Sequence, residues 1–199
     1  MLSTWMNRFM SGGGAVTSFS DDFNRADGDL TTSPNWTLLS GVSNGLTISS
    51  NAAANTGNTS AASFASYLSG TKRYIEFYLL SLVSNHSAYI ALAISDSANY
   101  LAAKYAGGQL YFTKRIAGAG TNIITYTATP GPTDLIRYEF DAVANTVRLL
   151  IAGSEVVGAT PVGSLVGLPT SLPPGLISGG GGSGAQVPWI DSFKYGVMA

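Results

Sequence analysis

Hydrophobic and polar positions change their period about twenty residues into the chain. Before that point, five apolar residues recur at the spacing of one helix face, Leu2, Trp5, Met6, Phe9 and Met10. A glycine-rich stretch, residues 11–14, follows and forms a flexible linker. From about Phe19 onward, short runs rich in β-branched and aromatic residues are separated by turn-forming residues. The pattern predicts a short helical arm over residues 1–18 and an all-β domain over residues 19–199.

The same pattern locates the individual strands of the β-domain. We expect strands at Asp22–Phe23, Trp36–Leu39, Leu46–Ser49, Ser63–Tyr67, Arg73–Val83, Ala88–Ser95, Asn99–Tyr105, Gln109–Lys114, Ile123–Thr127, Leu135–Asp141, Thr146–Ala152, Gly175–Ser178 and Pro188–Tyr195. Several of these runs alternate with a period of two, which places their polar side chains on one face and their apolar side chains on the other. Arg137 and Glu139 share one such face, opposite Tyr138 and its neighbours. Many short strands with frequent turns predict an antiparallel sandwich or barrel.

Composition narrows the classes of partner. The chain has 199 residues, of which 45% are hydrophobic and only 11% are charged, and its net charge is −1. Soluble domains usually carry about 25% charged residues, so Ser, Thr, Asn and Gly must form much of this surface. A neutral surface argues against nucleic acid as a partner, and against electrostatic attachment to anionic lipid. No run reaches the length of roughly 18 apolar residues needed to cross a bilayer.

Three stretches carry a resemblance to a known fold. The first is Asp21-Asp22-Phe23-Asn24-Arg25-Ala26-Asp27-Gly28-Asp29-Leu30, followed by Trp36. The second is the strand pair over residues 145–157, and the third joins residues 174–179 to Trp189-Ile190-Asp191-Ser192-Phe193. Their order resembles concanavalin A-like, laminin-G-like jelly rolls over roughly residues 20–197. The resemblance implies an antiparallel β-sandwich whose first and last strands pair, so that the two Asp-x-Phe motifs lie side by side.

The resemblance also suggests a setting for the protein. Versions of this fold with the same opening, little charge and no cysteine look like modules of bacteriophage virion proteins. We therefore expect a non-enzymatic structural protein of a virion, made in the host cytoplasm, that decorates the capsid or belongs to a tail or fibre. The arm would dock on other virion proteins, and the sandwich would face host surface glycans. We also expect homo-oligomers, with a trimer as one form, because the chain is apolar and poor in charge.

Two other functions stay open at this point. A free carbohydrate-binding lectin module would work without the arm. A glycoside hydrolase needs two carboxylates about 5–10 Å apart. The chain has three glutamates, and only Glu139 has a carboxylate two residues away, at Asp141. Arg137 shares that strand face, so we interpret the pair as part of a solvated outer surface. The one histidine, His86, lies in a polar turn without a nucleophile motif.

Metal and glycan sites are the remaining candidates. A cluster of four aspartates, Asp21, Asp22, Asp27 and Asp29, has the oxygen ligands that calcium prefers, but the same residues also suit turns and backbone caps. The absence of cysteine excludes disulfides and thiolate-bound zinc. We expect no cofactor. Four tyrosines of the middle strands are the candidates for stacking on sugars, Tyr100, Tyr105, Tyr111 and Tyr126. Each of them can also serve as core or cross-strand packing.

Overall fold

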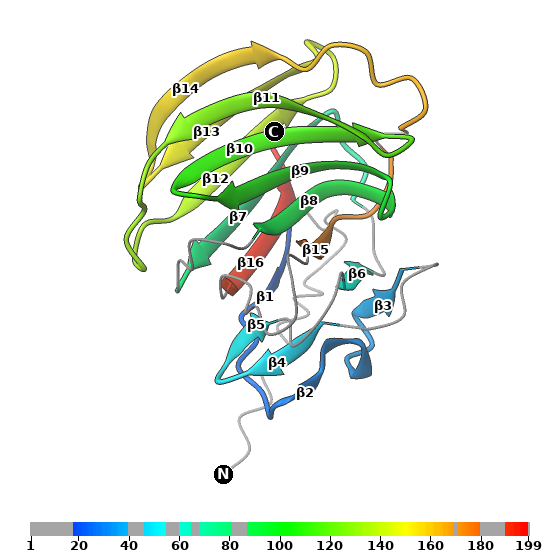
Figure 1. Ribbon diagram of the computed structural model, residues 1–199, viewed down its shortest axis with the longest axis vertical. Helices are drawn as coiled ribbons and strands as arrows, with labels where there is room; N and C mark the ends of the chain where they lie inside the picture. Colours follow the sequence, from blue (N-terminus) through cyan, green and yellow to red (C-terminus); the bar gives the residue numbers. More distant parts are fainter. Residues whose placement is uncertain are drawn as a thin grey trace, which may run out of the picture.

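The computed structural model describes residues 18–39, 46–54, 60–64, 68–80, 87–168, 171–179 and 190–198. These residues form two antiparallel sheets (Figure 1). The front sheet has the strand order β11-β10-β9-β8-β15-β6-β3, and the back sheet has the order β14-β13-β12-β7-β16-β5-β4-β2, with β1 paired to β16. One short 3-10 helix, Leu30–Thr32, lies between β2 and β3. The fold is therefore an all-β two-sheet sandwich, as the sequence predicts.

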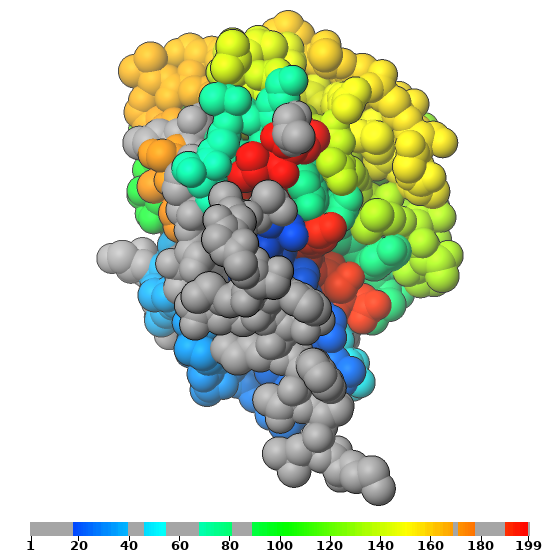
Figure 2. All heavy atoms as spheres, turned by 180° about the vertical axis from the view of Figure 1, so that it is seen from behind, coloured from blue at the N-terminus to red at the C-terminus, as the bar shows by residue number. Residues whose placement is uncertain are grey.

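The predicted strands occur in the expected order with differences at their ends, and β2, β5 and β14 are strands that the individual strand predictions do not include. The front sheet is made of β3 (Trp36–Leu38), β6 (Ser60–Phe64), β8 (Ser87–Asp96), β9 (Asn99–Ala106), β10 (Gln109–Ile116), β11 (Ala119–Thr127) and β15 (Gly175–Gly179). The back sheet is made of β1 (Ser18–Asp21), β2 (Gly28–Asp29), β4 (Thr47–Ser49), β5 (Ala52–Ala54), β7 (Lys72–Leu79), β12 (Ile136–Asp141), β13 (Thr146–Ile151), β14 (Ser154–Pro161) and β16 (Ile190–Val197). Figure 2 shows the molecule from behind, with β16 beside β7.

Two-residue turns fix the register of the long hairpins. Gly107 and Gly108 join β9 to β10, and both have positive φ, 57° and 77°. Ala117 and Gly118 join β10 to β11 with φ of 49° and 83°. Positive φ at both central positions is the type I′ geometry, whose twist matches that of the flanking strands. These turns therefore set which side chains of β9, β10 and β11 lie opposite one another.

Three rings bridge the two sheets in the core. Phe77 of β7 stacks on Tyr138 of β12 with ring centroids 6.4 Å apart, and Tyr138 stacks on Phe112 of β10 at 5.4 Å. The face opposite Tyr138 on β12 carries Arg137 and Glu139, as the alternation predicts. The core is therefore built from the inward positions of both sheets.

We predict that Tyr138→Phe stabilises the protein or leaves its stability unchanged. The Tyr138 side chain is fully buried and its hydroxyl has no hydrogen-bond partner. Burying an unpaired hydroxyl costs about 1–3 kcal/mol, and phenylalanine removes that cost while it keeps the ring. Chemical denaturation should give a free energy of unfolding equal to or up to about 3 kcal/mol above that of the wild type. A loss of more than 1 kcal/mol would show that the hydroxyl makes a useful contact.

The two Asp-x-Phe motifs lie side by side, as expected from the resemblance. β1 pairs antiparallel with β16, and Asp21 lies opposite Phe193. The expected first strand at Asp22–Phe23 is wrong in its bounds, since β1 ends at Asp21 and Phe23 has a positive φ of 53°. This conformation turns the chain away from the strand and directs the Phe23 ring into the core.

Several expectations lie outside the described residues. They include the predicted arm with its five apolar residues, the turn around His86, and Trp189. Across the ranges that the structure does describe, no helix is long and apolar enough to cross a membrane.

Candidate functional site

The candidate site is the outward face of the front sheet. Antiparallel register places Tyr89 of β8 opposite Lys104 of β9, and Lys104 opposite Tyr111 of β10. Tyr111 in turn lies opposite Thr125 of β11. Because side chains alternate along each strand, these residues share the face that points away from the core. We call Tyr89, Lys104 and Tyr111 the tyrosine–lysine strip. All three side chains are partly exposed.

A cation–π arrangement holds the strip together. The ammonium group of Lys104 lies 5.5 Å from the ring centroid of Tyr89 and 5.2 Å from that of Tyr111. Such contacts restrain the lysine and orient the two rings. The Tyr111 hydroxyl is hydrogen bonded to the Gln109 side-chain oxygen, and the Gln109 amide donates to the Thr127 hydroxyl at 3.2 Å. Polar groups of Gln109 on β10 and Thr127 on β11 therefore lie beside the strip.

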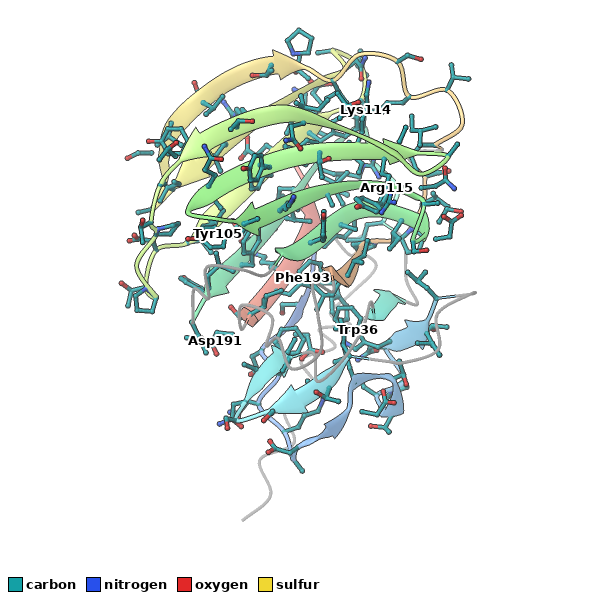
Figure 3. The ribbon with its side chains drawn as sticks, viewed as in Figure 1. Trp36, Tyr105, Lys114, Arg115, Asp191 and Phe193 are labelled. Atoms are coloured by element: carbon teal, nitrogen blue, oxygen red, sulfur yellow. The ribbon has the colours of Figure 1, made fainter. Side chains whose placement is uncertain are left out.

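Arg115 and Tyr100 form a second row on the same face. The two residues lie opposite each other on β10 and β9, four positions along the strands from Tyr111 and Lys104. Arg115 and Tyr105 lie at opposite ends of the β9–β10 pair (Figure 3). Small side chains, Ala102 and Thr113, lie between the two rows. At 3.3–3.4 Å per residue, the rows are about 13 Å apart along the strands.

Tyr100 is itself buried. Only 3% of it is exposed, and its ring packs edge-on against Tyr89 with centroids 5.4 Å apart. Burial, with a smaller contribution from Tyr89, raises the pKa of Tyr100 to about 12. A hydrogen bond with Arg115 acts in the opposite direction. Tyr100 therefore packs beside Tyr89 on the same face and does not present a free ring to a ligand.

We predict that Tyr100 ionises near pH 12 instead of near pH 10. The folded state holds this proton more tightly than the unfolded chain does. The stabilisation from this group is therefore complete below about pH 10 and is lost as the pH rises from 10 to 12. The check is the ultraviolet titration of tyrosinate in the wild type minus that of Tyr100→Phe. A difference curve with its midpoint at pH 10 would contradict the burial of the hydroxyl.

The outward face of the back sheet has a different chemistry. Six alternating charges cross β16, β7, β12, β13 and β14, in the order Lys194, Glu76, Arg137, Glu139, Arg148 and Glu155. We call this set the charge ladder. At its centre, Glu139 accepts hydrogen bonds from Arg137 Nε at 2.6 Å and from Arg148 Nε at 2.5 Å. The Arg137 guanidinium also lies 4.0 Å from the Tyr74 ring centroid. The three positive and three negative side chains of the ladder cancel, so its net charge is zero.

The carboxylate pair of the hydrolase alternative lies on this face. Glu139 and Asp141 line a hollow of about 340 Å³ together with Lys72 and Arg148. Both oxygens of Glu139 are bound by arginines. The pKa of Asp141 is lowered, mainly by a hydrogen bond from the Ala144 amide. A hydrogen bond from the Val143 amide and the nearby charge of Lys72 lower it further. A lowered pKa does not suit Asp141 to hold a proton at neutral pH, as a general acid must, and the Glu139 oxygens are occupied by the two arginines. This placement agrees with the interpretation of an outer surface.

The four tyrosines named from the sequence are divided between the two faces. Tyr111 lies on the outward face, in the strip. Tyr105 points into the core and is only 3% exposed, and Tyr126 packs against the same core. These two side chains, and the buried Tyr100, are not presented to a ligand, so we correct the candidate set to Tyr111 with Tyr89. The sequence alone does not tell which face of β9, β10 and β11 points inward, and the strand register decides it.

The aspartates of the calcium candidate have separate local partners. Asp21 accepts hydrogen bonds from the Phe23 amide, from Arg25 and from the Trp36 indole. Asp22 accepts from the amide of Asn24, Asp27 from that of Ser50 and Asp29 from that of Thr31. No group of three or more potential metal ligands occurs among the residues that the structure describes. The geometry is that of turns and caps, with each carboxylate used at a different place.

Comparison with known proteins identifies the class of fold. The chain superimposes on carbohydrate-binding module CBM66 from Bacillus subtilis with a TM-score of 0.52 and 12% identity, over 82% of this chain and 92% of that one. It also matches a protein described with the endo-acting O-glycanases by which human gut microbiota initiate mucin breakdown (TM-score 0.60, 13% identity, 92% and 100% covered). A third match is the Crh5 transglycosylase without ligand (TM-score 0.54, 15% identity, 93% and 86% covered).

These similarities define a concanavalin A-like lectin/glucanase β-sandwich. No model of a known protein family and no curated protein matches the sequence. The fold includes both carbohydrate-binding modules and carbohydrate-active enzymes. The function of this chain therefore depends on its own side chains and not on the fold alone.

Proposed function

We propose that the protein is a non-catalytic carbohydrate-binding module, and that the tyrosine–lysine strip on the front sheet contacts the sugar. The observation that carries the proposal is the strip itself. Two tyrosine rings and a lysine held between them lie partly exposed on one sheet face. Aromatic rings bind the apolar faces of sugars, and a polar tip is available beside each ring for hydroxyl groups. The fold class supports this assignment, because CBM66 has it too.

The surroundings of the strip supply hydrogen-bonding groups of neutral type. Thr125 and Thr127 are exposed on β11 beside Tyr111 and Gln109. Their hydroxyl and amide groups can both donate and accept, which suits a ligand covered with hydroxyls. Ligand sites combine apolar rings with a few convergent polar groups, as this face does. The proposed ligand is an extended oligosaccharide lying across β9, β10 and β11.

The non-catalytic part of the proposal rests on the carboxylates. The strip has no glutamate or aspartate of its own, whereas glycoside hydrolysis ordinarily uses two. The Glu139–Asp141 pair lies on the opposite sheet and is bound by arginines, backbone amides and a lysine. A carbohydrate-binding role without hydrolysis is therefore favoured over the enzyme alternative.

The virion role is a second proposal, and it rests on the sequence. The apolar stripe of residues 2–10 and its glycine linker suit a module that is fastened to a larger particle. Removal of residues 1–14 should leave the sandwich folded and abolish incorporation into particles. Normal incorporation of the truncated protein would refute the docking arm, and it would leave the carbohydrate proposal unaffected.

The carbohydrate proposal is tested on immobilised glycans with the full chain. Binding to a set of glycans, and loss of that binding in a variant of Tyr111, is the expected result. Absence of binding to any glycan in a broad array, by protein shown to be folded from its circular dichroism, would overturn the proposal. Release of reducing ends from a bound glycan would instead support the hydrolase alternative.

A further inference from the structure

The outward face of the front sheet has uncompensated positive charge. All eleven acidic residues of the chain lie within the described ranges. Lys104 and Arg115 form no ion pair with any of them. The sole acidic residue of β8–β11 is Asp96, at the β8–β9 turn, and its oxygens accept from Ala98 and Asn99.

The back sheet gives the contrast. Its lysines and arginines on the outward face, Lys72, Arg137, Arg148 and Lys194, each have a carboxylate within 4.0 Å. Arg25 is paired with Asp21. Only 11% of the residues are charged. Among the residues that the structure describes, Lys104 and Arg115 are the two cations on an outward sheet face without a carboxylate partner, and both lie at the candidate carbohydrate site. Ion pairs therefore neutralise the cations on the outward face of the back sheet, whereas the two cations on the outward face of the front sheet have none.

The two cations are available to a ligand in different ways. Lys104 contacts the Tyr89 and Tyr111 rings through its charge. Unlike an ion pair, these contacts leave its three N–H donors available for hydrogen bonds. Arg115 uses Nε for the Gly118 carbonyl at 3.0 Å, and it also contacts Tyr100. The remaining donors of its guanidinium suit a carboxylate or a sulfate. With the rows about 13 Å apart, the cations are spaced to meet anionic groups on different residues of one oligosaccharide.

We propose that this site, if the protein binds carbohydrate there as argued above, is selective for anionic saccharides that carry carboxylate or sulfate groups. Lys104 and Arg115 bind the acidic groups, and Tyr89 and Tyr111 contact the sugar rings. Neutral saccharides of the same backbone bind more weakly, because they leave both cations without a partner.

The test measures the affinity of the full chain for matched pairs of saccharides by calorimetry. Oligogalacturonate is compared with its methyl ester, sialyllactose with lactose, and sulfated dextran with dextran. In at least one pair the charged member should bind about tenfold more tightly, and raising the salt from 50 to 500 mM should reduce that preference. Lys104→Met and Arg115→Met should each lower affinity for the charged member about five- to tenfold, whereas Lys104→Arg should retain most of it.

Lys194→Met is the matched control. Lys194 also lies over a tyrosine, 5.5 Å from the ring centroid of Tyr74, but on the back sheet and paired with Glu76. This variant should bind the charged saccharide like the wild type. Equal affinity for the charged and neutral members of every pair that binds would overturn the anionic selectivity and leave carbohydrate binding intact. Failure of all three charged ligands to bind would overturn the anionic selectivity, and the broad glycan array tests the carbohydrate proposal separately. Equally tight binding to polyglutamate would also refute a saccharide-specific site.

Discussion

Trp36→Ala is expected to lower the free energy of unfolding by about 3–5 kcal/mol, the largest effect of any single substitution considered. The Trp36 ring is 3% exposed and lies close to both phenylalanines of the Asp-x-Phe motifs, with centroid distances of 6.2 Å to Phe23 and 6.0 Å to Phe193. Its indole N–H donates to Asp21 at 2.6 Å. Trp36 belongs to β3 of the front sheet. Asp21 and Phe193 belong to β1 and β16 of the back sheet, and Phe23 follows β1, so the Trp36 ring joins the two sheets (Figure 3).

Two further variants separate the contributions of packing and hydrogen bonding at Trp36. Trp36→Phe keeps most of the ring contact and removes the donor to Asp21, and it should cost about 1–3 kcal/mol. Leu38→Ala, on the same strand but with 39% of the side chain exposed, should cost less than about 1 kcal/mol. Urea denaturation followed by far-ultraviolet circular dichroism measures all three. A cost below 1 kcal/mol for Trp36→Ala would contradict the central role of the ring.

Tyr111→Ala is expected to weaken carbohydrate binding by about tenfold to a hundredfold, which corresponds to roughly 1.4–2.8 kcal/mol. The variant removes the ring that lies at the middle of the proposed contact face, and it also releases Lys104 from one of its two aromatic neighbours. Because the side chain is on the outward face, the fold should be retained. Isothermal calorimetry with a glycan chosen from the array gives the affinity, and thermal unfolding confirms that the variant is folded.

Tyr111→Phe distinguishes the ring from its hydroxyl. The variant keeps the aromatic face and loses the hydrogen bond to Gln109. If the sugar stacks on the ring, Tyr111→Phe should retain affinity to within about threefold of the wild type. A loss as large as that of Tyr111→Ala would mean that the hydroxyl, and not the ring, recognises the ligand.

The sequence predicts most of the sandwich because its strands alternate clearly. The run around Tyr138 shows inward and outward residues at alternate positions, and β12 has the faces that this alternation predicts. The pairing of the first and last strands follows from the resemblance carried by the two Asp-x-Phe motifs, and Asp21 does lie opposite Phe193. The alternation is a local property of the sequence and the pairing depends on a motif, so both can be predicted without knowledge of tertiary contacts.

Other parts of the fold have weak local signals. β5, Ala52–Ala54, consists of three alanines, which have low strand propensity, and only its neighbours β4 and β16 define it. β14, Ser154–Pro161, is an edge strand with no buried residue, so it lacks the apolar alternation of the others. The sequence indicates it only through the strand pair over residues 145–157 that carries the resemblance. Tertiary pairing therefore decides these strands more than their own residues do.

The candidate site is the part that the sequence predicts least well. Tyr111 is named from the sequence, but Tyr89, Lys104 and Arg115 become neighbours only when β8, β9 and β10 pair in register. Their common signal is an outward position in three successive strands. The bulge between Ala91 and Ala93 disturbs that signal. The unequal distribution of charge between the sheets is likewise invisible until the partners of each arginine and lysine are known.

The central claim is that the outward face of β8–β11 binds carbohydrate, and nuclear magnetic resonance of the ¹⁵N-labelled full chain tests it most directly. The protein is titrated with the oligosaccharide that binds most tightly in the matched pairs, and the shifts of backbone amides are mapped on the structure. We predict that the largest shifts fall on Tyr89, Lys104, Tyr111 and Arg115 and their neighbours on β8–β11. Largest shifts on the charge ladder of β7, β12, β13 and β14 would contradict the claim.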